Sequence, residues 1–168
     1  RLNAAVAGVG GAARFYSDNG FVGGPPELVW PAIEAYSRDL EALQLEFRLS
    51  ASQCFSPSGN YGERPESCPI GELLDDDGAV VGHGLNVCNI PVGENGFVQR
   101  FLSSKAAVIM SNINKIKTEL NDYPNEAWIV LIKSSAHQWD YWEAHALPSE
   151  TRAHSAEIDI VLLEAAKC

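Results

Sequence analysis

Two apolar stretches on either side of a tight polar turn dominate the N-terminal part of the chain. Residues 15–16 and 21–22 supply aromatic and β-branched strand formers. Between them, Asp18-Asn19-Gly20 is a turn sequence, because Asn and Gly tolerate the positive φ that short hairpin loops need. A Gly-Gly-Pro-Pro run at residues 23–26 then stops the second strand. This pattern predicts a β-hairpin over residues 14–22.

Apolar residues then recur at helical spacing over residues 27–47, which predicts an amphipathic helix with one face on a sheet. Residues 49–55 are expected to form a strand and residues 56–69 a polar loop. Asp75-Asp76-Asp77-Gly78 lies between two short strands, at residues 70–74 and 79–81. We interpret it as a hairpin turn rather than a metal site, because adjacent side chains do not easily converge on one ion. Residues 85–92 are expected to form one more strand.

The remainder of the chain is expected to be helical. Asn95 can cap a helix that runs to about residue 120, Asn125 can cap a second that runs to about residue 145, and a third starts at Pro148. Short connections marked by proline indicate a small helical bundle. The sequence therefore predicts an α+β chain with a small antiparallel sheet and one packed helix in residues 1–93, and three helices in residues 94–168.

The charge of the chain bears on its partners. Twelve Lys and Arg against 22 Asp and Glu give a net charge of −10. A protein that grips phosphates normally has a basic face, so this balance does not favour nucleic-acid binding by the isolated chain. No run approaches the roughly 18 apolar residues that a membrane helix needs.

The four cysteines, Cys54, Cys68, Cys88 and Cys168, lack the paired spacing of a zinc site. Four cysteines allow three disulfide pairings, and the sequence does not choose among them. We expect most of them to be reduced thiols, which favours a soluble intracellular protein over a secreted one.

Several segments together resemble the palm and thumb of retroelement reverse transcriptases. The palm motif of that family, Tyr-x-Asp-Asp, stands here as Tyr16-Ser17-Asp18-Asn19, with Asn19 in place of the second Asp. The helix at residues 27–47 and the segment at 49–54 are similar to the palm helix and the strand beneath it. Residues 84–93 resemble the entry to the thumb, and residues 97–102 and 135–142 resemble thumb helices.

The resemblance implies a palm-like sheet followed by a thumb-like bundle, with Asp18 as the remaining metal ligand. Polymerase palms hold two Mg²⁺ ions with carboxylates from separate strands. The family's fingers and its first catalytic Asp would lie before Arg1. One carboxylate does not hold two Mg²⁺ ions, because Mg²⁺ keeps its waters unless several oxygens converge on it. The expected function is therefore a non-catalytic, retroelement-derived remnant without a cofactor, acting as a structural or protein-binding subunit of a larger assembly.

The partner-binding candidates are the aromatic residues of the thumb-like part: Trp128, Trp139, Tyr141 and Trp142. Any of these left exposed would mark a partner surface, whereas the alternative is core packing. A second hypothesis is a fragment of an active Mg²⁺-dependent polymerase in which Asp18 binds the metal. A third is hydrolytic or redox chemistry built on His83, His137, His145, His154 and the cysteines, although no Ser or Cys lies in a recognised nucleophile motif.

Overall fold

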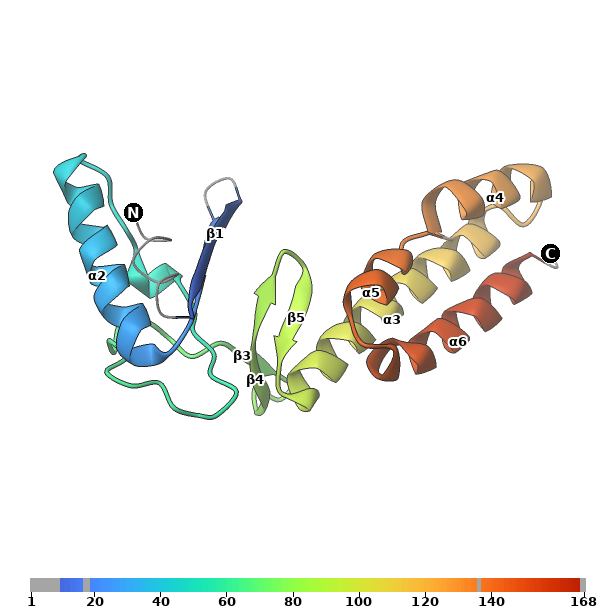
Figure 1. Cartoon of the computed structure of the whole chain (residues 1–168). Coiled ribbons are helices and arrows are strands. Elements are labelled where there is room, and N and C mark those ends of the chain that lie inside the picture. The colour runs from blue at the N-terminus through green and yellow to red at the C-terminus, as the bar shows by residue number, and fades with distance from the viewer. Residues whose placement is uncertain (1–9, 17–18, 136, 167–168) are drawn as a thin grey trace. The chain divides into compact units, whose positions relative to one another are not determined.

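The computed structural model describes residues 10–16, 19–135 and 137–166. It contains helices and antiparallel strands, which confirms the α+β class (Figure 1). Two compact units can be distinguished, Arg1–Gly71 and Glu72–Cys168. The described strands form a two-stranded sheet in the first unit and a three-stranded sheet in the second, where the sequence predicted one small sheet.

The first unit contains the predicted hairpin and the helix packed on it. Strands β1 (Ala12–Tyr16) and β2 (Asn19–Gly23) pair in antiparallel register, and helix α2 (Pro26–Ala42) follows. Ala13 of β1 and Ala32 of α2 are buried together, with Val22 and Tyr36 packed against them. This small apolar contact holds the hairpin to the helix.

Helix α2 ends earlier than the predicted residue 47. Gln44 has a φ of 60°, and the N–H of Leu45 donates to the Leu40 carbonyl at 2.9 Å. This left-handed termination is usually made by Gly, so Gln44 gave no signal for it in the sequence.

The prediction of a strand at residues 49–55 is wrong. Residues Leu49–Ala51 form a short 3₁₀ helix, η1, and only Cys54 makes a β-bridge, to Ile70. The N–H of Cys54 donates to Pro69, and the N–H of Gly71 donates to Cys54. Pro69 has no N–H with which to continue a ladder, so the pairing stays at one bridge.

The second unit begins with strands β3 (Glu72–Leu74), β4 (Val80–Val87) and β5 (Ile90–Gly93), in the order β3-β4-β5. The single strand predicted at residues 85–92 is in fact a second hairpin. Its turn residues Cys88 and Asn89 both have positive φ, 51° and 66°, as a tight hairpin turn with right-handed strand twist requires.

Helices α3 (Asn95–Glu119) and α6 (Pro148–Ala165) confirm two of the predicted helices and pack on each other. Between them the chain was expected to form one helix over residues 125–145. It forms instead α4 (Pro124–Val130), a π-helical segment η2 (Leu131–Ser135) and α5 (Asp140–His145). The hydroxyl of Ser134 donates to the Val130 carbonyl at 2.6 Å, a local bond that competes with regular α-helix pairing.

The helices enclose the main core of the second unit, which includes Leu102, Ile113, Leu131, Trp139 and Ile158. The units separate between residues 71 and 72, whereas the sequence placed the boundary between residues 93 and 94. The physical reason is close packing of β4 on α3: Gly82 and Gly84 lie directly against Phe97. In the described part of the chain, no helix is long and apolar enough to cross a membrane.

Candidate functional site

The Tyr16-Ser17-Asp18-Asn19 motif lies at the turn of the first hairpin, and its first and last residues are the last pair of the β-ladder. Tyr16 of β1 is the partner of Asn19 of β2, and Phe15 is the partner of Gly20. Asn19 and Gly20 are therefore strand residues, where the sequence predicted that they form the turn. Ser17 and Asp18 lie outside the described residues, between the two paired ends.

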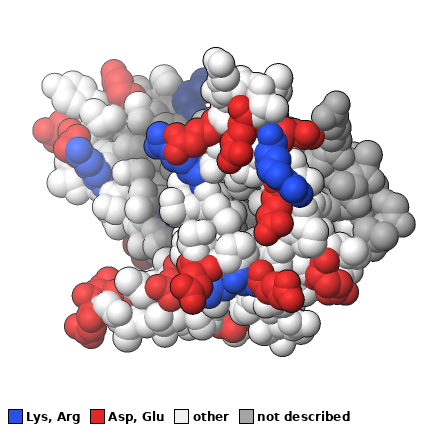
Figure 2. Space-filling model, turned by 90° about the vertical axis from the view of Figure 1, so that its left-hand side faces the viewer, with Lys and Arg blue, Asp and Glu red and all other residues white. Residues whose placement is uncertain are grey.

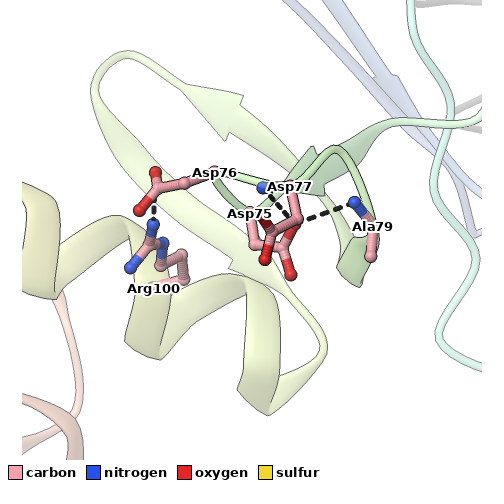
Figure 3. A network of polar contacts seen from close by, with 5 residues as sticks. All are labelled: Asp75, Asp76, Asp77, Ala79 and Arg100. Carbon is pink, nitrogen blue, oxygen red and sulfur yellow. Dashed lines mark hydrogen bonds and ion pairs between the residues drawn. The ribbon is translucent and has the colours of Figure 1, made fainter.

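The acidic run after β3 is the hairpin turn that the sequence predicted. The Asp75 carboxylate accepts hydrogen bonds from the N–H groups of Asp77 at 3.0 Å and Ala79 at 2.8 Å. Asp76 points instead toward α3, where Arg100 donates to it at 2.9 Å (Figure 3). Gly78 closes the turn with a φ of 81°. The carboxylates of Asp75 and Asp76 thus serve the turn and its contact with α3.

Glu94 joins β4 to the start of α3. Its carboxylate accepts the N–H of His83 at 2.9 Å, and its own N–H donates to the His83 carbonyl at 2.8 Å. The hydrogen bond from the His83 backbone holds the pKa of the Glu94 carboxyl below its usual value of 4.5. These two hydrogen bonds between Glu94 and His83 fix the position at which the sheet ends and helix α3 begins.

Two of the four aromatic candidates belong to the core. Trp139 is 3% exposed and Trp142 is 9% exposed, and their ring centroids lie 5.4 Å apart. The indole N–H of Trp139 donates to the Ser155 hydroxyl at 3.0 Å, and that of Trp142 donates to the Asn89 carbonyl at 3.1 Å. Both polar groups are satisfied, so these two residues stabilise the bundle from inside.

Tyr141 lies at the edge of the same contact. Its side chain is 38% exposed, and its hydroxyl donates to the Cys88 carbonyl in the turn of the second hairpin. Together with the Trp142 bond to Asn89, this ties α5 to the β4–β5 turn. Tyr141 therefore has a structural contact as well as an exposed face.

Trp128 is the aromatic candidate that is most exposed, at 52%. Three apolar neighbours in sequence are also at the surface: Tyr123, Ile129 and Ile132. We name these four residues the α4 surface. Beside it, a hollow of about 100 Å³ is lined by Leu120, Trp128 and Ala165, among others. Small-molecule sites usually measure about 300–1,000 Å³, so this hollow suits a single side chain rather than a ligand of that size.

Tyr123, Ile129 and Ile132 were not among the predicted candidates, although the sequence held a signal for the two isoleucines. Residues 127–132 are apolar without interruption. Six consecutive apolar residues point in all directions around a helix and cannot all be buried against one bundle, so some of them must remain at the surface.

The histidines do not converge on a shared centre among the described residues. His83 contacts Glu94, His137 contacts Asp140, and His145 contacts the Tyr141 carbonyl. His154 has the arrangement nearest to a catalytic one: Nε2 lies 3.5 Å from the Ser103 hydroxyl and Nδ1 lies 3.8 Å from Glu157.

These distances exceed those of a working nucleophile–base pair, about 2.6–3.2 Å. Ser103 also lies inside α3, where the N–H groups around it bond within the helix and do not form an oxyanion hole. The contacts of His154 with Ser103 and with the Trp139 ring, 5.7 Å away, are those of a residue between two packed helices.

Comparisons of the chain with protein-family models, with curated proteins and with solved structures found no match.

Proposed function

We propose that the chain is a palm-and-thumb segment of reverse-transcriptase type that has lost metal-dependent catalysis and serves as a structural, protein-binding part of a larger assembly. The order of elements supports this proposal. A hairpin with the Tyr-x-Asp motif, a packed helix, further short strands and a helical bundle follow one another along the chain. This is the order that the resemblance in the sequence implies, except that η1 replaces the palm strand expected at residues 49–54 and the strands after it belong to the helical unit.

The presence of Asn19 in place of the second Asp of the motif supports the loss of catalysis. An Asn side chain offers Mg²⁺ a neutral amide oxygen, whereas the motif needs a charged carboxylate. In-line nucleotidyl transfer relies on two metal ions about 3.5–4 Å apart, each neutralising developing charge on oxygen. With Asn19 in the motif, the hairpin offers one carboxylate, Asp18, to that pair of ions.

The charge distribution supports a protein partner over a nucleic acid. On the face shown in Figure 2, the basic side chains that are drawn in colour lie among acidic ones. Binding along a phosphate backbone depends on a continuous basic stripe, because each contact with Lys or Arg releases a counterion.

The exposure of the apolar residues of the α4 surface is the main support for a protein-binding role. Its residues Tyr123, Trp128 and Ile129 are each more than half exposed, at 59%, 52% and 58%. Aromatic and aliphatic residues at a surface are favoured as anchors in protein interfaces, where burial of Trp and Tyr contributes most of the binding energy. The adjoining hollow can accept one side chain of the partner.

The test is a differential capture experiment with the full chain. Proteins bound to the natural chain are compared with those bound to Trp128→Ser/Ile129→Ser. Leu163→Ser is the matched control, because Leu163 is an equally exposed apolar residue, at 61%, on α6. We expect a defined protein to be retained by the natural chain and by the control, and to fall at least about tenfold with the double variant, as loss of a Trp anchor worth about 2 kcal/mol predicts. Equal recovery with all three chains would refute the role of the α4 surface.

One observation favours a second candidate, a segment of an active Mg²⁺-dependent polymerase. The pairing of Tyr16 with Asn19 leaves two residues between the strands, so that Asp18 immediately precedes β2. A catalytic carboxylate would stand at such a strand end, and a further carboxylate from an upstream strand would complete the metal site. Primer extension by a longer natural form of the protein, abolished by Asp18→Ala, would establish this candidate.

A further inference from the structure

Two thiols from distant positions in the sequence meet in the first unit. The Cys54 sulfur lies 3.5 Å from the Pro69 carbonyl oxygen, and the Cys68 sulfur lies 4.0 Å from the same oxygen. The backbone fixes this arrangement: the N–H of Cys54 donates to Pro69 at 3.0 Å, and the N–H of Gly71 donates to Cys54 at 2.9 Å. The isolated bridge between Cys54 and Ile70 thus brings the ends of the loop 55–67 together.

The two thiols have different environments. Cys54 is half-buried, whereas Cys68 is only 2% exposed. Burial raises the pKa of the Cys68 thiol from its usual 9.0 to about 11; the neighbouring Cys54 thiol adds to this rise through charge and hydrogen bonding, and the Arg64 guanidinium opposes it. Cys54 is therefore the thiol that an external reagent reaches first.

We propose that Cys54 and Cys68 form a disulfide by exchange with a low-molecular-weight disulfide such as glutathione disulfide, closing the loop 55–67. In the first step, the Cys54 thiolate attacks one sulfur of glutathione disulfide, that S–S bond breaks, and one glutathione thiolate leaves. In the second, the Cys68 thiolate attacks the Cys54 sulfur and expels the second glutathione thiolate. The protein loses two electrons and two protons, and glutathione disulfide is reduced to two thiols.

The loop between the two cysteines can adjust to this closure. A disulfide requires the sulfurs to approach to about 2.05 Å, so the side chains must rotate and the loop must shift slightly. Residues 57–60 and 63 are exposed, whereas Gly62 lies close against Pro26 of α2, so we expect the adjustment on either side of Gly62. Formation of the mixed disulfide also removes the Cys54 thiol, one of the groups that keeps Cys68 protonated, and so favours the second step.

The closed loop would act on α2. The indole N–H of Trp30 in that helix donates to the Tyr61 carbonyl at 2.7 Å, within the segment that the disulfide closes. This contact is already formed while both cysteines are free thiols, so the disulfide would restrain the loop in its present position against the helix.

The test uses the full chain with Cys88→Ser and Cys168→Ser, so that only the two thiols in question remain. It is incubated with glutathione disulfide, quenched by alkylation and digested without reduction for mass spectrometry. We expect a peptide pair linked through Cys54 and Cys68. With Cys68→Ala added, we expect glutathione to remain on Cys54. With Cys54→Ser added, we expect Cys68 to react at least several-fold more slowly than Cys54 does in the Cys68→Ala chain, because Cys68 is buried and burial alone keeps its pKa raised and hinders access of the reagent.

Stable mixed disulfides on both cysteines without an internal link would overturn the proposal. So would a link from Cys54 to Cys88 in the natural chain in place of the link to Cys68. Circular dichroism of each variant shows whether the fold is retained. If Cys68→Ala fails to fold, the disulfide-linked peptides found in the chain with only Cys88→Ser and Cys168→Ser still show whether Cys54 and Cys68 are joined.

Discussion

Leu102→Ala is expected to lower the free energy of unfolding of the second unit by about 2–5 kcal/mol. Leu102 of α3 is fully buried, at 0% exposed, in the core that α3 forms with α5 and α6. Truncation removes apolar contacts and leaves a cavity that the surrounding helices can fill only in part. Urea unfolding followed by tryptophan fluorescence measures the loss, because Trp139 and Trp142 lie in the same core.

Leu163→Ala is the control for this measurement. Leu163 is 61% exposed on α6, so the same substitution there is expected to change the free energy of unfolding by less than about 0.5 kcal/mol. Equal effects at the two positions would mean that α3 does not form the centre of this unit.

The second large effect is expected from Gly82→Ala. A Cβ at Gly82 of β4 would lie 2.6 Å from the backbone nitrogen of Phe97 and 3.3 Å from the carbonyl carbon of Gly96. Both are backbone atoms at the start of α3, so the strand must move away from the helix rather than a side chain turning aside. We expect a loss of about 1–3 kcal/mol or more in the free energy of unfolding, as overpacking typically costs.

Asn86→Ala is the matched control, because Asn86 lies on the same strand with an exposed side chain. Its expected effect is within about 0.5 kcal/mol. A tolerated Gly82→Ala substitution would contradict the close contact between β4 and α3, and with it the assignment of the β3–β5 sheet to the helical unit.

The parts of the fold that the sequence predicted are those in which local chemistry and burial agree. The long apolar stripe of α3 predicted that helix, and Pro148 predicted the start of α6. Asp75 and Gly78 predicted the turn between β3 and β4. In each case the residues that fix the local structure are adjacent or separated by one helical turn, so their pattern is visible without the fold.

The parts that could not be predicted depend on distant contacts or on unusual backbone. The second hairpin needs positive φ at Cys88, a residue that seldom adopts it, and its turn is held by α5 through Tyr141 and Trp142. The interruption of the helix at residues 125–145 also accompanies distant contacts, since Trp139 bonds to Ser155 of α6 and Trp142 bonds to Asn89 of the second hairpin. Neither contact leaves a local signature in the sequence.

The aromatic residues of the candidate site could be named from the sequence, but which of them are exposed could not be predicted. The sequence named four aromatic residues, and periodicity alone could not separate buried Trp139 from exposed Trp128, because both lie in a segment rich in apolar residues. The disulfide proposed between Cys54 and Cys68 is one of several pairings that four cysteines allow, and the sequence does not show the bridge between Cys54 and Ile70 that brings these two close.

Calorimetric titration of Mg²⁺ and Mn²⁺ into the natural chain measures whether the hairpin still binds the metal that catalysis would need. Asp18→Ala serves as the negative control, and Asn19→Asp restores the second carboxylate of the motif. We expect no specific heat of binding in the natural chain, because one carboxylate does not displace the waters of Mg²⁺. Tight binding in the natural chain that is lost in Asp18→Ala would contradict this expectation and would establish a working metal site at the hairpin.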